Sequence, residues 1–585
     1  MSTTTAGGSQ SRTSSSVEPL KPSSSSQAQL DRAVERVGQG ASRFAKLSLD
    51  ERIQLARGMQ AGYLRIARGS VEAACAAKGI TLGTPLEGEE WTLGPWFVVR
   101  HLRLIAQSLH SLKQTGNTPV GKIARTADQR LSVQVFPAGA IDGLLFQGVR
   151  VDVHLQPGVT ESEMENSRAR FYKKPDHEGR LVLVLGAGNV NGIPSMDVLS
   201  KMFNEGKACI LKMNPVNAYL GPFLEEAFAD AIRQGYFAVV YGEADEGAYL
   251  ASHRGVDEIH LTGSDRTYDQ LVWGPAGPDR EIRKAQGRPV LQKPVTAELG
   301  NVSPVIVVPG PYSEKQLLYQ AEDVAAGLTY NASFDCNANN VLILPKGWTR
   351  REAFLNALER ALSKTTSRRA YYPGAQDRWR SSSKDRASVR RFGLETPDSL
   401  PWALVRDIDP ANREERAFSS ESFCPIAFET QVGSADPLEF LDQAVTFANE
   451  RLWGTLSAGL VVHPKTLKDP ATGGAVDRAI TKLRYGAVCV NAWSGYLFAF
   501  VSPPWGAHPS STPADIQSGT GWVHNTPMLE GIEKAVMRHP ITAMPKPPYF
   551  PSHRSAHVLM PRITALEENA SWSKVPGVLA AAMRA

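Results

Sequence analysis

One cysteine stands among small and polar residues in the segment NASFDCNANN, residues 331–340. Cys336 follows Asp335 and precedes Asn337, whereas a structural cysteine usually has apolar neighbours in sequence. A thiol in a polar setting can act as a nucleophile once it is deprotonated. The alternative is a loop thiol with no chemistry, which is the commoner case. The residues by themselves leave both interpretations open.

Other residues that could do chemistry follow short apolar segments. The glycine-rich turn GAGNVNG follows 181–185, Lys212 ends 208–212, and the tripeptide TGS, residues 262–264, follows 258–261. Backbone N–H groups or a lysine at such places can approach a phosphate. A tight turn, a solvated strand end and a helix N-cap explain the same residues without a ligand. Each signal is therefore weak when taken alone.

The elements that would position these residues alternate along the chain. Three apolar segments, 181–185, 208–212 and 237–241, are typical of buried strands. Helical patterns lie between them and end at Gly206 and Gly235, where C-terminal caps are expected. This alternation predicts an α/β fold with a Rossmann-type parallel sheet, and ligands bind such sheets beyond the carboxyl ends of the strands.

Composition limits the class of protein. The 585 residues are 42% hydrophobic and 21% charged, as in globular proteins. A net charge of +5, spread along the chain, predicts no nucleic-acid partner, and no apolar run is long enough to predict a membrane span. The five cysteines are scattered without metal-ligand spacing, which predicts no metal site and a reducing compartment, the cytoplasm.

The two ends differ from the middle. Residues 1–29 are rich in Ser and Thr and are predicted to form a disordered tail, with order beginning near Gln27. Ser48 and Glu51 have the spacing of a capping box and predict a helix start. The C-terminal extension, residues 496–585, is rich in proline, and we predict a mostly irregular segment that wraps over the domain or a partner subunit.

Taken in order, these pieces resemble the aldehyde dehydrogenase superfamily from about residue 35 to about residue 510. Asn189 and Lys212 are followed by TGS, by ELGNVSP with Glu298, by Cys336 and by ESFCP with Glu421. The resemblance implies that Cys336 adds to an aldehyde carbonyl, that Asn189 helps to stabilise the oxyanion, and that Glu298 activates water to hydrolyse the thioester. It also implies NADP or NAD as hydride acceptor. The expected cofactor-binding residues are Lys212, Gly247, Gly263, Ser264 and Glu421.

The sequence departs from the family pattern beside these residues. Pro194 comes late in NVNGIP, so Asn191 competes with Asn189 for the oxyanion role. Asn301 and Cys424 stand where the family has glycines in ELGG and E-x-F-G-P. These changes indicate a divergent member whose aldehyde cannot be inferred from better-known ones.

The resemblance also divides the chain into domains. The expected NAD(P)-binding domain uses 30–120 and 180–297, and the catalytic domain uses 298–495. Between them, 121–179 holds RLSVQVFP and VRVDVHL, whose alternation is typical of exposed antiparallel strands. In the family such a hairpin carries oligomerisation, so we expect a homo-oligomer, a dimer or a tetramer.

Three functions fit these observations. The first is a hydrolytic aldehyde dehydrogenase, and the others are an acyl-CoA or acyl-phosphate reductase of the same fold and a non-catalytic structural member. Reductases typically lack the general-base glutamate, so the presence of Glu298 favours the first. Pro215 stands where NAD-preferring members often have an acid, so we predict that NADP is accepted at least as well as NAD.

Overall fold

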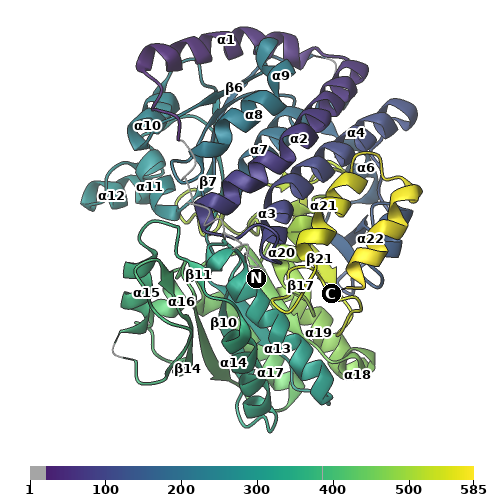
Figure 1. Ribbon diagram of the computed structural model, residues 1–585, viewed down its shortest axis with the longest axis vertical. Coiled ribbons are helices and arrows are strands. Elements are labelled where there is room, and N and C mark those ends of the chain that lie inside the picture. The colour runs from purple at the N-terminus through teal and green to yellow at the C-terminus, as the bar shows by residue number, and fades with distance from the viewer. Residues whose placement is uncertain (1–20, 175, 385, 585) are drawn as a thin grey trace, which may run out of the picture.

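The computed structural model describes residues 21–174, 176–384 and 386–584, and two β-sheets organise them (Figure 1). Parallel strands alternate with helices in both sheets, which confirms the predicted α/β fold class. The predicted disordered tail falls mainly outside the described residues. Its predicted limit at residue 29 is too late, because helix α1 already begins at Gln27.

The six-stranded sheet has the order β19-β8-β7-β4-β5-β6. Its neighbouring strands are parallel, except that β19 lies antiparallel to β8. The strands are β4 (Leu181–Leu185), β5 (Ala208–Lys212), β6 (Phe237–Val240), β7 (Glu258–Gly263), β8 (Val295–Leu299) and β19 (Gly519–Thr520). The predicted strands are present, with the parallel arrangement expected of a Rossmann-type sheet.

Helices cover both faces of this sheet, which explains why its strands are apolar throughout. Leu181 and Leu183 pack in the cluster that includes α1 and α10, whereas Val182 and Val184 pack in the cluster that includes α2 and α7. Successive side chains of a strand point to opposite faces, so both faces must be apolar. The covering helices are α1 (Gln27–Ala45), α2 (Leu49–Lys78), α4 (Phe97–Thr115), α7 (Ile193–Leu199), α8 (Gly221–Ala227), α9 (Ala229–Arg233) and α10 (Ala244–Ser252).

Helix α2 begins with the predicted capping box. Ser48 Oγ accepts a hydrogen bond from the Glu51 N–H at 3.3 Å, and the Glu51 carboxylate accepts one from the Ser48 N–H at 2.8 Å. Two N–H groups of the first turn are thereby satisfied, as the pattern requires.

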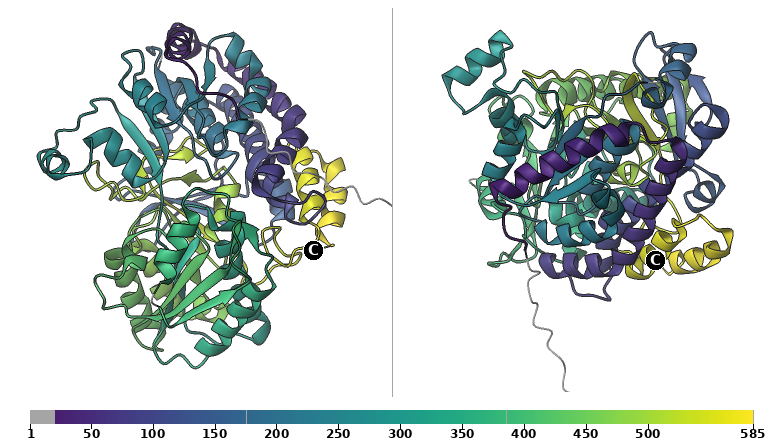
Figure 2. Two further views of the ribbon diagram at one scale, coloured as in Figure 1. Left: turned by 60° about the vertical axis from the view of Figure 1, so that its left-hand side comes forward. Right: turned by 90° about the horizontal axis from the view of Figure 1, so that it is seen from above.

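The second sheet has eleven strands, in the order β1-β2-β3-β21-β17-β16-β9-β10-β15-β14-β12. The strands are β1 (Ile123–Arg125), β2 (Leu131–Phe136), β3 (Arg150–Leu155), β9 (Ser303–Val307), β10 (Asn339–Pro345), β12 (Val389–Phe392), β14 (Trp402–Ile408), β15 (Ile426–Val432), β16 (Ser457–Val461), β17 (Ala487–Val490) and β21 (Ile532–Arg538). Helices α13 (Glu314–Thr329) and α14 (Arg351–Lys364) cover one face, and α17 (Pro437–Arg451) and α19 (Pro470–Lys482) cover the other. Figure 2 shows the central strands of this sheet in the green part of the molecule and most of the smaller sheet in the blue-to-teal part.

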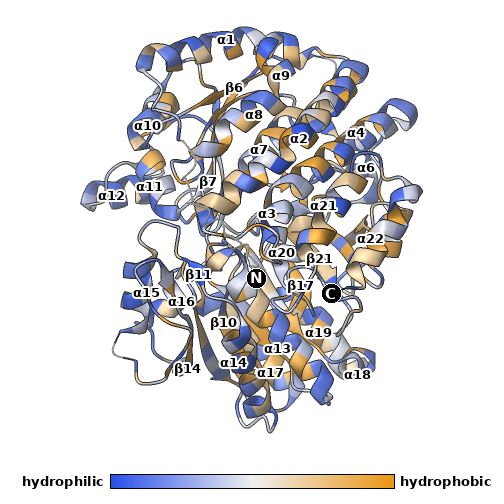
Figure 3. Cartoon of the chain, in the orientation of Figure 1, coloured by the Kyte–Doolittle hydropathy of each residue, from blue (hydrophilic) through white to orange (hydrophobic). Residues whose placement is uncertain are grey.

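Shorter elements complete the described chain. Apart from short 3₁₀ and π-helical turns, these are α3 (Glu87–Trp91), α5 (Ala140–Leu145), α6 (Glu161–Ser167), α11 (Asp265–Trp273), α12 (Pro278–Gln286), α15 (Ala375–Ser383), α16 (Arg416–Ser419), α18 (Pro464–Lys468), α20 (Ser494–Ala499), α21 (Ala556–Leu566), α22 (Val575–Ala582), β11 (Arg368–Arg369), β13 (Ser399–Leu400), β18 (Pro504–Trp505) and β20 (Val523–His524). Orange residues gather inside and blue ones on outer helices such as α12 (Figure 3). Within the described ranges, no helix is both long enough and apolar enough to cross a membrane.

The predicted hairpin strands are antiparallel, but they are not exposed. β2 and β3 pair with each other, and Val133, Val151 and Val153 are fully buried. The prediction of exposed strands is wrong because β21 pairs along the free edge of β3 and joins the hairpin to the larger sheet. Alternation in the sequence could not show that the second face would be covered as well.

The C-terminal extension contributes strands to both sheets, which the prediction of a mostly irregular wrap did not include. It supplies β19 to the smaller sheet and β21 to the larger one. Helix α21, yellow in Figure 1, then packs against α3, and α22 packs against α21. The prolines of the extension lie between and within these helices and strands and do not prevent them from forming.

Arg100, on α4, connects the extension to the rest of the chain. Its guanidinium is fully buried and forms ion pairs with Asp142 and Glu567, each at 2.7 Å. Its Nε also donates to the carbonyl oxygen of Phe500 at 3.0 Å. One buried cation thus neutralises carboxylates from α5 and from the segment after α21.

Replacing this cation should destabilise the fold. Arg100→Met leaves the buried Asp142 carboxylate without its ion-pair partner and leaves Glu567 with Arg103, and we expect a loss of about 3–5 kcal/mol in the free energy of unfolding. Arg57→Met, at an exposed position on α2, is the matched control and should change it by less than about 0.5 kcal/mol. Urea unfolding followed by circular dichroism measures both, and equal stability of the two variants would contradict this role for Arg100.

Candidate active site

Cys336 lies on a loop whose backbone is left-handed at three successive residues. Helix α13 ends at Thr329, and Asn331, Ala332 and Ser333 have φ angles of 49°, 56° and 73°. Non-glycine residues seldom adopt this conformation, although Asn does so more readily than most. The surrounding structure must therefore hold the loop in place.

The buried side chain of Asn331 provides much of that support. Its Nδ2 lies 3.1 Å from the carbonyl oxygen of Asn189, 3.2 Å from that of Phe334 and 2.9 Å from Asp335 Oδ1. Its Oδ1 accepts a hydrogen bond from Lys78 Nζ at 3.0 Å. One amide thus joins the Cys336 loop to the turn after β4 and to the end of α2.

Charged side chains from distant parts of the chain surround Asn331. Lys78 Nζ lies 3.0 Å from Glu90 Oε1, and both side chains are at most 2% exposed. Arg368 donates to both oxygens of Glu89, at 2.9 and 2.8 Å, and Glu89 accepts from the Asn331 N–H. The Asn331 cluster comprises Lys78, Glu89, Glu90, Asn331, Asp335 and Arg368. Sequence reasoning missed its charged members, because no motif links residues so far apart.

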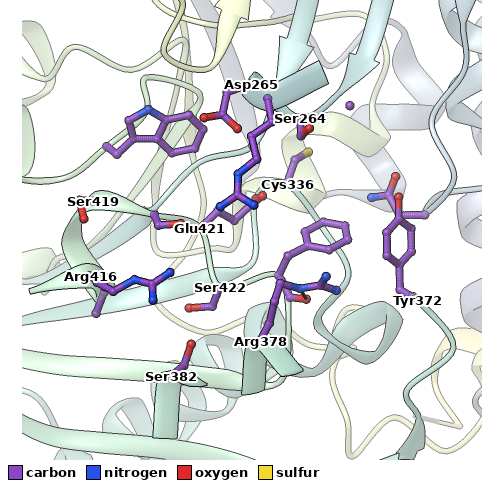
Figure 4. A pocket seen from close by; sticks show the side chains of 18 of the residues that line it. Ser264, Asp265, Cys336, Tyr372, Arg378, Ser382, Arg416, Ser419, Glu421 and Ser422 are labelled. Carbon is purple, nitrogen blue, oxygen red and sulfur yellow. Dashed lines mark hydrogen bonds between the residues drawn. The ribbon is translucent and has the colours of Figure 1, made fainter. Parts of the chain in front are cut away.

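Cys336 lines two cavities. The first is a groove of about 820 Å³ at the carboxyl ends of the β4 and β7 strands, and it also receives Asn189, Glu298 and Glu421 (Figure 4). The second is a small cavity of about 40 Å³, which we call the aromatic cavity. The thiol is partly exposed and stands where the two spaces meet.

Aromatic side chains form most of the wall of the aromatic cavity. They come from α4 and the segment before it, from the Cys336 loop, from the region of α20 and from the C-terminal extension, which supplies Tyr549. Tyr549 OH donates to Asp323 Oδ1 at 2.6 Å, which fixes the ring against α13. Sequence reasoning missed this contribution because it placed the extension outside the domains. The aromatic lining residues are Trp96, Phe97, Tyr330, Trp493, Tyr496, Phe498 and Tyr549.

Glu298 ends β8 and faces the groove beside Cys336. It is 3% exposed, and its Oε1 has no hydrogen-bond partner among the described residues. Burial, with a contribution from the charge of Asp197, raises the pKa of Glu298 to about 8. Burial and the nearby carboxylates Glu298 and Glu421 raise the pKa of the Cys336 thiol as well.

The structure separates the two asparagines that compete for the oxyanion role. Asn189 lines the groove, and its Nδ2 donates one hydrogen to the Phe334 carbonyl at 2.8 Å, leaving a second donor. Asn191 is buried away from both cavities and donates to Glu90 at 2.7 Å. The geometry therefore favours Asn189.

Three of the expected cofactor-binding residues line the groove, namely Gly263, Ser264 and Glu421. Ser264 is also the N-cap of α11, where its Oγ accepts from the Thr267 N–H at 3.2 Å, so its structural explanation holds beside the functional one. A Cβ at Gly300 would lie 2.2 Å from Glu421 Oε2, so only glycine leaves that carboxylate its place. The size of the groove and these glycine-lined walls fit a dinucleotide.

Lys212 and Gly247 are not among the residues that line the groove. Gly247 is buried inside α10 near Leu185. Lys212 ends β5 as predicted but is 7% exposed, and burial lowers the pKa of its amine while the carboxylates of Glu243 and Glu246 oppose that effect. These two acids lie near Lys212 and had no counterpart in the sequence-based analysis.

The departures from the family motifs have structural explanations. Asn301 is fully buried and its Nδ2 donates to Ser303 Oγ and to the Ser457 carbonyl, both at 2.9 Å, which ties the turn after β8 to β16. The Cys424 thiol is fully buried in an apolar cluster, and burial raises its pKa to about 12. Cys424 is therefore poorly placed to act as a nucleophile.

Comparison with known proteins defines the class. Residues 194–375 match the model of the aldehyde dehydrogenase family. The same fold occurs in NADP-dependent glyceraldehyde-3-phosphate dehydrogenase from Bacillus halodurans C-125 complexed with NADP, with a TM-score of 0.59, 16% identity and coverage of 88% of this chain and 91% of that one. The matched segment and the shared fold confirm the resemblance to the aldehyde dehydrogenase superfamily.

Particular relatives are distant. Indole-3-acetaldehyde dehydrogenase in complex with NAD+ gives a TM-score of 0.58 at 16% identity and covers 89% of this chain and 92% of that one. Betaine aldehyde dehydrogenase 2 from Rhizobium meliloti (strain 1021) is 30% identical over 154 residues, which are 26% of this chain and 28% of that protein. The match thus spans less than a third of this curated relative.

Proposed function

We propose that this protein oxidises an aldehyde to a carboxylic acid with NAD or NADP as hydride acceptor. The observation that carries the proposal is the position of Cys336 between a polar groove and an aromatic cavity, with Glu298 facing the groove. A nucleophile at this junction can attack the carbonyl carbon of an aldehyde that enters from the aromatic cavity. The aldehyde hydrogen then faces the groove.

The side chains support each step of this reaction. Cys336 Sγ, as the thiolate, forms a bond to the carbonyl carbon, and the oxygen takes the negative charge. The free hydrogen of Asn189 Nδ2 and the Cys336 N–H are the donors for that oxygen. When bound in the groove, the nicotinamide cofactor supplies the acceptor for the hydride that the tetrahedral adduct must lose. Glu298 then takes a proton from water, the hydroxide oxygen bonds to the thioester carbon, and the Cys336 thiolate leaves.

The same residues favour hydrolysis over transfer to coenzyme A or phosphate. Glu298 lines the groove and its Oε1 has no hydrogen-bond partner among the described residues, which leaves this oxygen available to a water molecule. A non-catalytic role would leave unexplained why Cys336 alone among the five free cysteines is accessible. We further propose a cytoplasmic homo-oligomer, as the reduced cysteines and the family resemblance suggest.

Cys336→Ala should abolish cofactor reduction while the fold is kept, because no other described thiol reaches the cavities. Cys424→Ala is the matched control and should retain activity, because its thiol is buried in an apolar cluster. Initial rates with a panel of aldehydes, together with thermal midpoints of both variants, measure this. Normal turnover by folded Cys336→Ala would contradict the mechanism.

Glu298→Gln should keep the geometry but remove the base. We expect a burst of reduced cofactor near one equivalent per active subunit, and then turnover slower than wild type by about 10²–10⁴-fold. The wild-type kcat should rise with pH through about 8, because the base is the carboxylate form and its pKa is raised to about 8. The variant should lose that dependence. If coenzyme A restores its steady rate, the reductase assignment is correct instead.

The cofactor preference tests the acids near Lys212. The prediction that NADP is accepted at least as well as NAD stays a prediction, and the acids Glu243 and Glu246 near Lys212 bear on it. Replacing Glu243 and Glu246 by Gln should raise kcat/KM for NADP relative to NAD by about tenfold, since each acid repels a 2′-phosphate. Glu226→Gln, at an exposed position on α8, is the control. An unchanged ratio would exclude these acids from cofactor selection.

A further inference from the structure

The aromatic cavity has one carboxylate among its lining residues, and the proposed reaction does not use it. Asp335 lines this cavity directly beside Cys336 and is 5% exposed. Its Oδ1 accepts from Asn331 at 2.9 Å, whereas Oδ2 has no hydrogen-bond partner among the described residues. A buried carboxylate oxygen without a donor is costly, which points to a ligand that supplies one.

The charges around Asp335 do not balance. The Asn331 cluster contains two cations, Lys78 and Arg368, and three carboxylates, Glu89, Glu90 and Asp335. Each cation already has its own carboxylate partner, at 3.0 and 2.8 Å. Asp335 therefore holds the excess negative charge. Burial raises its pKa to about 7, which agrees with the lack of a counter-ion.

The rest of the wall suits a cation. Aromatic side chains such as Trp96, Trp493 and Tyr549 line the cavity, and aromatic rings attract ammonium groups. The volume of about 40 Å³ has room for about three water-sized groups. A chain of two carbons and one nitrogen beyond the carbonyl carbon has that size.

We propose that Asp335 selects a short aldehyde that carries an ammonium group, which completes the charge balance of the Asn331 cluster. The ammonium N–H donates to Asp335 Oδ2 while the carbonyl carbon lies at Cys336 Sγ. The turnover experiment described below rests on the proposed function, whereas the binding experiment does not. No new covalent step is involved, because the aldehyde is oxidised as described above.

Binding is tested without turnover. Propylammonium should slow the alkylation of Cys336 by iodoacetamide in the wild type, followed by mass spectrometry, whereas 1-propanol at the same concentration should not. Asp335→Asn keeps the acceptor for Asn331 but removes the charge, and should lose this protection. Asp152→Asn, which removes a buried carboxylate on β3 that lines neither cavity, should keep it. Equal protection by both compounds in the wild type would overturn the proposal, even if Asp335→Asn fails to fold.

Turnover provides the second arm. In the wild type, kcat/KM for 3-aminopropanal should exceed that for butanal by about 10-fold to 100-fold, the range expected for a hydrogen bond to a charged group. Asp335→Asn should lower this ratio to about one while it still oxidises butanal. A wild type that prefers butanal, 3-hydroxypropanal or succinic semialdehyde would overturn the selection by Asp335. Failure to oxidise any aldehyde would instead refute the proposed function, and the alkylation arm would still decide on the site.

Discussion

The hydrogen bonds of Asn331 are the constraint on which the site depends. Three successive non-glycine residues in the left-handed region form a strained loop, and such a loop persists only where its surroundings determine it. A single buried amide holds Asn189 and the end of α2 against this loop. Cys336 and Asn189, the proposed nucleophile and oxyanion donor, are therefore positioned by the same side chain.

The charged shell around that amide explains why helices far away in sequence matter to the site. Lys78 ends α2, and Glu89 and Glu90 lie on α3, so their charges reach the loop only because these helices pack against it. Buried ion pairs contribute little net stability compared with apolar residues of similar size. Here these ion pairs act by fixing the orientation of the Asn331 and Asp335 side chains.

The C-terminal extension contributes to the same site by a different route. β21 closes the gap between β17 and β3, and the chain then returns to place Tyr549 in the aromatic cavity. Arg100 and Glu567 anchor the helices that follow. The extension thus combines a structural role in both sheets with a role in the size of the cavity beside Cys336.

The sequence by itself determined the parallel sheet and the residues that follow its strands, because strand periodicity and glycine caps are local patterns, whereas the roles expected of Cys336 and Glu298 came from the family resemblance. It also determined the capping box of Ser48. Only the tertiary structure decided that Asn189 rather than Asn191 reaches the groove, and that Asp335 keeps an unpaired oxygen. These outcomes depend on which distant side chains supply the remaining hydrogen bonds, and no local pattern encodes that. The strands of the C-terminal extension could not be predicted for the same reason, because a strand such as β21 forms only where neighbouring strands offer edges for pairing.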